Sequence, residues 1–250
     1  MPALADAKPP GPSSPGPSSP GRFSSGPSLS DSGRWRDLGL RTASAAVLLP
    51  AVLGGLWAGG IVWIALLAVA YGVMMFEWQA MAARRPAPFQ WGAGIAWILP
   101  ASVALIWLRG HDAGGFGNVL FLLCVVWASD IGAYVVGRLV GGAKLAPSIS
   151  PGKTRWGAVG GLGAAIGAGL VAAWLGDGAF VTAAIIAAGL GIASQAGDLL
   201  ESAVKRHFGV KDSGNLIPGH GGLLDRVDAV LTTAPVAAAL VAWRGVALWR

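Results

Sequence analysis

The sequence predicts an all-α, polytopic integral membrane protein, and three observations support that fold class. Hydrophobic residues make up 54% of the 250-residue chain and charged residues only 12%. A soluble domain carries roughly a quarter charged residues, so this deficit indicates a membrane protein. Long apolar runs recur along the chain, and the charged residues gather in the short segments between them. The basic residues favour alternate segments, as the loops of a multi-span protein do.

The first 33 residues differ in composition from the rest. They are dominated by Pro, Gly and Ser, as in PPGPSSPGPSSPG. Such a segment cannot bury enough apolar surface to offset its ordering entropy. We therefore expect a disordered tail over residues 1–33 and one transmembrane domain over residues 34–250. Arg34-Trp35-Arg36 then resembles an interfacial lead-in at the headgroups.

A membrane-spanning helix needs about 20 mostly apolar residues, and about seven stretches qualify. The first is short and contains Gly and Pro, which is compatible with a tilted span, with close helix pairing or with a run into the second stretch. The fifth and sixth are rich in Gly and Ala, which favours close helix packing and permits a homodimer. Cys124, the single cysteine, lies in the fourth and is expected to be buried. The stretches are Thr42–Trp57, Gly60–Ala82, Phe89–Leu108, Gly117–Gly137, Trp156–Leu175, Ala179–Ala196 and Ala229–Trp249.

Basic residues predict the orientation. With the N-terminus inside, the outer side holds only Arg109, Arg244 and Arg250 among the Lys and Arg residues, and the inner loops hold the others. The positive-inside rule therefore favours a multi-pass protein of the inner (plasma) membrane, with its N-terminus and polar loops in the cytoplasm. The net charge of +6 favours acidic partners, such as lipid headgroups or nucleotide phosphates. Nucleic acid is not expected, because the basic residues are divided among short loops.

Residues 202–228, SAVKRHFGVKDSGNLIPGHGGLLDRVD, form a polar stretch in this apolar chain. Two Lys, two Arg, two His and three Asp lie within it, a density that suits a site for phosphates and a metal. Asp225 and Asp228 share one face of a helix if the last span begins here. Carboxylates are the usual protein ligands of Mg²⁺. An Asp at a helix start also complements the helix dipole, but that explains one Asp better than a pair.

The glycines beside His220 suit a phosphate. Gly219, Gly221 and Gly222 let the backbone approach a ligand closely, and exposed amides can cradle a phosphate. His220 can donate to a phosphate oxygen or to a pyrophosphate leaving group. The alternative is an incidental loop histidine.

Residues 198–206 predict a helix that continues from the sixth span. Asp198, Ser202 and Lys205 are spaced four and three apart, so they share one helix face. Asp198 follows a glycine at the membrane boundary, which favours a functional role. Glu201 is expected to be an ordinary solvated helix residue.

The segment SISPGKTR, residues 148–155, contains a Gly-Lys-Thr. A P-loop requires Gly five residues before Gly152, where Pro147 stands, and no strand is expected before it. The segment is therefore not interpreted as a P-loop. Ser150, Lys153 and Thr154 still suit a phosphate, although a basic inner loop that obeys the topology rule explains them equally well.

Two acids are predicted inside spans. Asp130 lies about 10 Å from the inner end of the fourth span at about 1.5 Å per residue, and Glu77 about 8 Å from the inner end of the second. Intramembrane acids are costly and functional by default. For Glu77, a buried structural pair with an inner-loop arginine is equally compatible.

The polar stretch resembles a known signature. Its spaced positions match that of the phosphatidate cytidylyltransferases, also called CDP-diacylglycerol synthases, and the SPGKT loop and the WASDIGAY run at residues 127–134 are similar to that family as well. The matching positions are Ser202, Lys205-Arg206, Lys211-Asp212, Gly214, Ile217-Pro218, His220-Gly221-Gly222, Asp225-Arg226 and Asp228.

The resemblance implies a reaction and a division of roles. Phosphatidate and CTP would give CDP-diacylglycerol and pyrophosphate at a bilayer surface, with Mg²⁺ as cofactor and room for a second metal ion. The implied metal ligands are Asp198 and Asp225, with Asp228 and Asp130 added. The implied catalytic residues are Lys205, Arg206, Lys211, Asp212, His220 and Arg226. The implied phosphate-binding residues are Ser150, Lys153, Thr154, Ser202, Gly221 and Gly222.

Two other functions were weighed. A CTP-dependent polyprenol kinase would share a polytopic fold and phosphate-handling loops, but the complete signature disfavours it. A transporter would show paired repeats and polar groups near the midplane, whereas the charge here is concentrated on one side and late in the chain.

Overall fold

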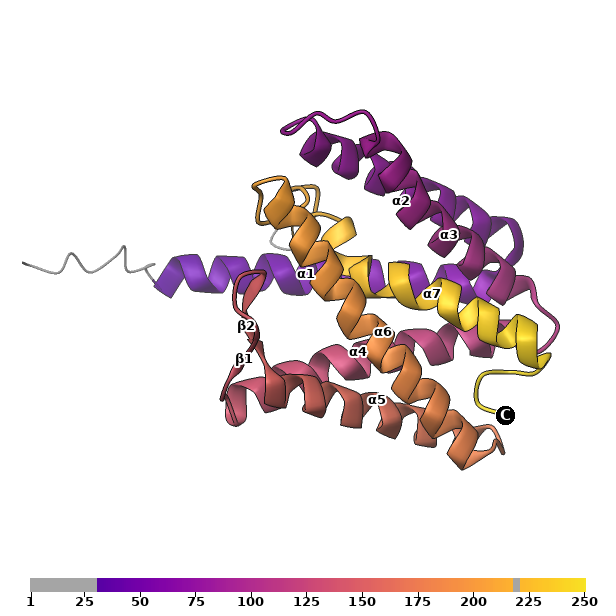
Figure 1. Ribbon diagram of the computed structural model, residues 1–250. Coiled ribbons are helices and arrows are strands. Elements are labelled where there is room, and N and C mark those ends of the chain that lie inside the picture. Colours follow the sequence, from indigo (N-terminus) through magenta and orange to yellow (C-terminus); the bar gives the residue numbers. More distant parts are fainter. Residues whose placement is uncertain (1–30, 218–220) are drawn as a thin grey trace, which may run out of the picture.

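The structure is a bundle of long helices with one small hairpin at its side (Figure 1). The computed structural model describes residues 31–217 and 221–250. Most of the predicted tail, residues 1–30, lies outside the described residues, so its disorder stays a prediction. The elements are α1 (Asp31–Ala58), α2 (Gly60–Ala82), α3 (Gln90–Gly110), α4 (Gly115–Leu139), β1 (Lys144–Ala146), β2 (Ser150–Thr154), α5 (Arg155–Leu175), α6 (Phe180–His207) and α7 (Leu224–Arg244).

The all-α membrane class is confirmed, but the count of seven spans is not. Six helices in the described part of the chain, α2 to α7, are long and apolar enough to cross a membrane. The first predicted stretch, Thr42–Trp57, lies in α1, whose apolar part is only Ala46–Ala58. That part is shorter than the roughly 20 residues that a bilayer requires.

Two helix boundaries differ from the predicted spans in a way that matters for the site. Helix α6 continues past Ala196 to His207, as the spacing of Asp198 and Lys205 predicted. Helix α7 begins at Leu224 rather than Ala229, and it ends at Arg244, where Gly245 takes a left-handed φ of 67°. The earlier start brings Asp225 and Asp228 into the first two turns of α7.

The prediction that no strand precedes the SPGKT segment is wrong. Strands β1 and β2 pair antiparallel, with Lys144 opposite Thr154 and Ala146 opposite Ser150. Residues 150–154 are themselves a strand. The segment is therefore not the loop between a strand and a helix that a P-loop requires.

Glycines allow α5 to pack closely against both of its neighbours. A Cβ added to Gly157 would lie 2.9 Å from the Ala133 carbonyl oxygen of α4, and one added to Gly169 would lie 2.8 Å from the Ala183 carbonyl oxygen of α6. The prediction of close packing by the Gly/Ala-rich helices is thus confirmed within the chain. Cys124, expected to be buried, is exposed on α4.

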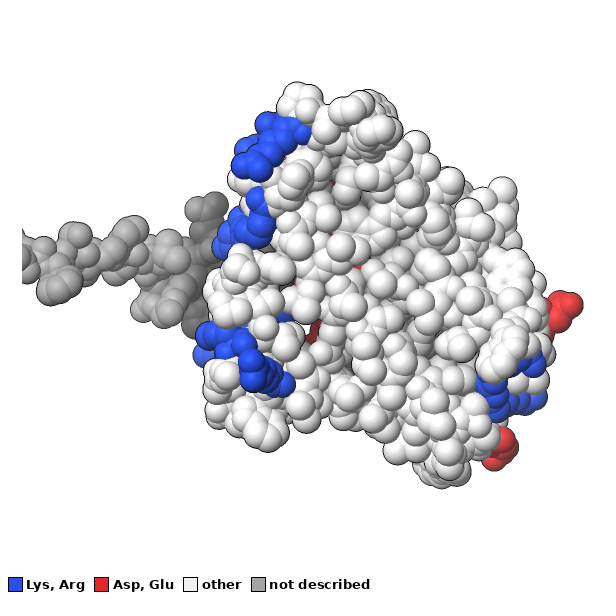
Figure 2. All heavy atoms as spheres, in the orientation of Figure 1, with Lys and Arg blue, Asp and Glu red and all other residues white. Residues whose placement is uncertain are grey.

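One end of the bundle carries the basic loops. Lys and Arg side chains gather along one edge of the molecule, and acidic atoms are visible in a narrow opening beside it (Figure 2). The Trp78 ring of α2 contacts the Phe208 ring after α6, with 5.8 Å between centroids. Arg206 Nε donates to the Ile149 carbonyl oxygen of the hairpin at 3.3 Å. The end of α2, the hairpin and the segment after α6 therefore meet at this basic end.

Candidate active site

A pocket of about 440 Å³ opens between α4, α5, the hairpin and α6. Small residues line much of it, because glycines and alanines let α4 and α5 approach each other. Its polar lining includes two predicted metal ligands, Asp130 and Asp198, and two predicted phosphate-binding residues, Lys153 and Thr154. The other polar lining residues are Tyr134, Arg138 and Gln195.

Lys153 and Asp198 form an ion pair across this pocket. Their side chains come from β2 and α6 and keep 29% and 32% exposure, so both remain accessible to a ligand. Asp130, on α4, interacts electrostatically with both of them. The structure thus brings together three residues that lie far apart in the sequence.

Lys205 lies at the centre of a second, buried cluster. Its Nζ lies 2.5 Å from Glu201 Oε2 and 2.8 Å from Asp225 Oδ1. The prediction that Glu201 is a solvated residue is wrong, because its side chain is 1% exposed. The reason is that α7 packs over this face of α6 and covers Glu201 together with Lys205.

Asp225 is surrounded by hydrogen-bond donors. Both of its carboxylate oxygens accept from the Ser213 amide, at 3.1 and 2.9 Å, and Oδ2 also accepts from the Gly222 amide at 3.0 Å. The residues before α7 therefore fold around this carboxylate. Gly221, with a φ of 84°, supplies the left-handed backbone conformation that the turn needs.

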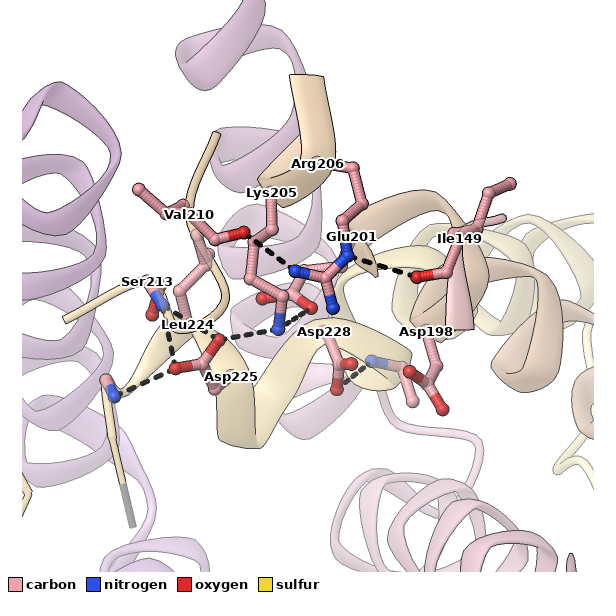
Figure 3. A network of polar contacts seen from close by, with 12 residues as sticks. Ile149, Asp198, Glu201, Lys205, Arg206, Val210, Ser213, Leu224, Asp225 and Asp228 are labelled. Atoms are coloured by element: carbon pink, nitrogen blue, oxygen red, sulfur yellow. Dashed lines mark hydrogen bonds and ion pairs between the residues drawn. The ribbon is translucent and has the colours of Figure 1, made fainter. Parts of the chain in front are cut away.

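Asp228 connects the two clusters. Figure 3 shows it between Asp225 and Asp198, and it interacts electrostatically with Asp198, Asp130 and Lys205. Its Oδ1 accepts from the Ala229 amide at 2.8 Å. Asp130, Asp198 and Asp228 thus form an acidic group with Lys153 beside it.

Glu77 of α2 reaches the start of α7. Its carboxylate accepts from the amides of Leu223 and Leu224, at 2.9 and 2.8 Å, and from Ser213 Oγ at 3.4 Å. Among the described residues, Glu77 forms no ion pair with an inner-loop arginine, which was the alternative interpretation. Glu77 instead binds backbone amides at a helix N-terminus, where the dipole favours an anion.

The remaining predicted residues lie on the hairpin, at the end of α6, in the segment before α7 and in the first turn of α7. Arg206 donates to two carbonyl oxygens, those of Ile149 at 3.3 Å and Val210 at 3.1 Å. Thr154 Oγ1 caps α5 by accepting from the Gly157 amide at 3.0 Å. Ser150 and Ser202 are partly buried, and Lys211, Asp212 and Arg226 are exposed. His220 lies outside the described residues, so its role stays a prediction.

The donor set fits Mg²⁺ only in part. Within residues 31–217 and 221–250, no three Asp, Glu, His or Cys side chains are arranged to hold a metal by themselves. Mg²⁺ is usually bound through one or two carboxylates plus water and substrate phosphates, and Asp198, Asp228 and Asp130 supply such carboxylates. Asp225 fits less well, because its oxygens already accept from Lys205, Ser213 and Gly222. The metal assignment stays a prediction.

Sequence reasoning gave no site role to five members of these clusters, namely Ser213, Glu201, Gln195, Tyr134 and Arg138. Ser213 could not be identified, because a serine in a loop does not by itself indicate a functional site. Gln195 lines the pocket and donates to the Ala158 carbonyl oxygen at 3.0 Å, but a single glutamine in an apolar span does not indicate a binding site. Glu201 could have been found, because it lies one turn before Lys205 on the same helix.

Known proteins resemble this chain over most of its length. The profile of the cytidylyltransferase family matches residues 91–243. A phosphatidate cytidylyltransferase of Brucella suis biovar 1 (strain 1330) is 38% identical, over 79% of this chain and 91% of that protein. One of Rickettsia bellii (strain RML369-C) is 35% identical, over 80% of this chain and 89% of that protein. The aligned region contains the pocket, the Lys205 cluster and Asp228, and the chain belongs to the cytidylyltransferase family.

Proposed function

We propose that this protein transfers a cytidylyl group from CTP to phosphatidate, giving CDP-diacylglycerol and pyrophosphate. The observation that carries the proposal is the pocket that holds Lys153 beside the carboxylates of Asp198 and Asp130. A reaction between a phosphomonoester and a nucleoside triphosphate needs a cation beside acids that can share a metal. The names of the relatives from Brucella and Rickettsia support the same reaction.

The nucleophile is the phosphate of phosphatidate. A phosphomonoester has a second pKa of about 6 and is largely dianionic at neutral pH, so the reaction requires no strong general base. The difficulty is the approach of one polyanion to another. Lys153 and Arg138 line the pocket and would offset that repulsion, and Lys153 would exchange its partner Asp198 for a substrate phosphate.

Asp198, Asp228 and Asp130 are the residues that would hold Mg²⁺ together with the phosphates of CTP. A bound Mg²⁺ would neutralise phosphate charge and stabilise the departing pyrophosphate. Lys205 would compensate the charges of Glu201 and Asp225, so that the first turn of α7 keeps Asp228 turned toward Asp198. We place this site on the cytoplasmic side, because the basic loops gather at its end of the bundle.

The membrane helices give the proposal its substrate class. Phosphatidate keeps its acyl chains in the bilayer, so its headgroup must meet the site at the interface. The pocket lies between helices long enough to span the membrane, α4, α5 and α6. Asp130, on α4, would therefore face the headgroup from within the bundle.

The test uses the full-length protein purified in detergent, with phosphatidate, Mg²⁺ and CTP labelled at the α-phosphate. We expect label in a lipid product, lost with EDTA and strongly reduced in Asp198→Asn. Asp112→Asn is the matched control, because Asp112 is an exposed acid in the α3–α4 turn outside the pocket. No lipid label from α-labelled CTP would overturn the proposal. Transfer of a γ-label to a polyprenol would identify a kinase instead.

A further inference from the structure

Glu77 is a buried acid in the membrane-spanning part of the chain, and its side chain is 3% exposed. It lies on α2, outside residues 91–243 that match the family. It also lies 146 positions from Leu223, whose amide it binds. An intramembrane acid is costly to keep, so an acid in this position calls for a role.

Its partners explain how the charge is tolerated. The first amides of a helix have no acceptor within the helix, and Glu77 accepts from two of them, Leu223 and Leu224. Ser213 Oγ lies 3.4 Å from Oε2 as a third donor. Among the described residues, no Lys or Arg forms an ion pair with it. The carboxylate is therefore held by the segment that precedes α7 and by the start of that helix.

Two carboxylates, those of Asp225 and Glu77, hold this segment. Asp225 accepts from the Ser213 and Gly222 amides, whereas Glu77 accepts from the Ser213 hydroxyl and from the next two amides. The packing is tight, since a Cβ on Gly222 would lie 2.7 Å from Glu77 Oε2. Any shift of Glu77 must therefore move the backbone that binds Asp225.

We propose that Glu77 is a positioning residue for the cytidylyl transfer. It fixes residues 213 and 222–224 and, through them, the first turn of α7. This keeps Asp225 in its ion pair with Lys205 and Asp228 near Asp198. This inference rests on the proposed function for its kinetic consequence, but its structural part can be tested separately.

Glu77→Gln is the informative variant because it preserves the volume of the side chain. The Gln carbonyl oxygen can accept one amide, but its amino group would face the other donor. We expect kcat to fall about 10- to 100-fold, since a displacement of about 1 Å can have that effect. The KM for CTP should change by less than about threefold, because the lost interaction aligns groups rather than binding CTP. A wild-type kcat in Glu77→Gln would overturn the proposal.

Two further variants separate positioning from a general loss of stability. Asn118→Ala is the matched control. Asn118 lies on α4 away from the pocket, it is fully buried, and its Oδ1 accepts from the Leu248 amide at 3.0 Å. It should lose stability but keep kcat per folded molecule within about threefold. Ser213→Ala removes only the hydroxyl donor and should lower kcat less than Glu77→Gln does. Equal losses of kcat in Glu77→Gln and Asn118→Ala would contradict a positioning role.

A spectroscopic measurement tests the position of the segment without any assay of activity. A nitroxide attached at Leu216→Cys, in a Cys124→Ala background, reports on the segment, because Leu216 is 57% exposed. Glu77→Gln should increase the mobility of this label, and Asn118→Ala should not. An unchanged spectrum in Glu77→Gln would overturn the inference, whether or not the wild type transfers a cytidylyl group. A wild type that transfers no cytidylyl group would overturn only the proposed function.

Discussion

At the scale of single residues, the site separates accessible carboxylates from buried ones. Asp198 keeps 32% exposure and lines the pocket, whereas Asp225 keeps 6% and is surrounded by donors. A carboxylate that binds a metal needs accessible oxygens. Asp198 pairs with the partly exposed Lys153, whereas the oxygens of Asp225 accept from Lys205, Ser213 and Gly222. We therefore expect different tasks for these two acids, which the family resemblance both implies as metal ligands.

Replacement by asparagine should distinguish those tasks. Asp198→Asn is expected to raise the Mg²⁺ concentration for half-maximal activity by at least about 10- to 100-fold, the loss that follows when even an outer-shell partner of a metal ligand is removed. Asp225→Asn should lower kcat at every Mg²⁺ concentration, because it disrupts the contacts to Lys205, Ser213 and Gly222. Measuring cytidylyl transfer by both variants as a function of Mg²⁺ concentration distinguishes the two effects. Equal increases in the Mg²⁺ requirement would mean that Asp225 is a ligand after all.

The Lys205 cluster allows a stability test with a direction. Lys205→Met leaves two buried carboxylates, Glu201 and Asp225, without a counter-charge, and breaking a buried pair in this way costs about 3–5 kcal/mol. Glu201→Gln leaves one lysine against one carboxylate and should cost much less. Thermal unfolding in detergent compares the two variants, with Lys144→Met as an exposed control. A larger loss in Glu201→Gln than in Lys205→Met would contradict the described pairing.

The kind of site could be predicted from the sequence, but the contacts between its residues could not. The density of Lys, Arg and Asp in residues 202–228 predicted a phosphate site, and helical spacing placed Asp198 and Lys205 on one face. The contact between Glu77 and Leu224 joins residues 147 positions apart, and no local pattern encodes it. Burial of Glu201 depends on α7 packing over α6, which periodicity in one helix cannot reveal.

At the scale of elements, apolar runs located the helices well because the bilayer sets their length. The β1–β2 hairpin was missed, since strands of three and five residues leave too short a pattern to recognise. Yet this hairpin places Lys153 opposite Asp198, so a small element forms one wall of the pocket. Arg206 links this hairpin to the end of α6 through a hydrogen bond to the Ile149 carbonyl oxygen.

Glycine packing along α5 predicts opposite effects at two positions. A Cβ at Gly169 would lie 2.8 Å from the Ala183 carbonyl oxygen, whereas one at Gly163 would meet nothing within 4 Å. Gly169→Ala should destabilise the fold by about 1–3 kcal/mol, because overpacking separates α5 from α6. Gly163→Ala should stabilise it by up to about 1 kcal/mol, the usual gain in a helix. Detergent unfolding curves test both, and a stable Gly169→Ala variant would contradict this packing.

At the scale of the whole molecule, charge is distributed unevenly between the two ends of the bundle. Ten of the 16 described Lys and Arg residues lie in the α2–α3 turn, in the region from the end of α4 through the hairpin to the start of α5, and in the region from the end of α6 to the start of α7. Figure 2 shows Lys and Arg side chains along one edge of the molecule. The opposite end has Arg109 at the end of α3 and Arg244 at the end of α7. Since CTP is a cytoplasmic nucleotide, the proposed function and the positive-inside rule predict the same orientation.

Cysteine labelling tests that orientation directly. In a Cys124→Ala background, Lys144→Cys marks the hairpin and Asp112→Cys marks the α3–α4 turn, and both residues are exposed. A membrane-impermeant maleimide should react with Lys144→Cys only in inside-out vesicles and with Asp112→Cys only in right-side-out vesicles. We expect these two positions on opposite sides, because α4, which is long and apolar enough to cross a membrane, lies between them. Reaction of Lys144→Cys in sealed right-side-out vesicles would place the pocket outside, where CTP could not reach it, and would contradict both the topology and the proposed reaction.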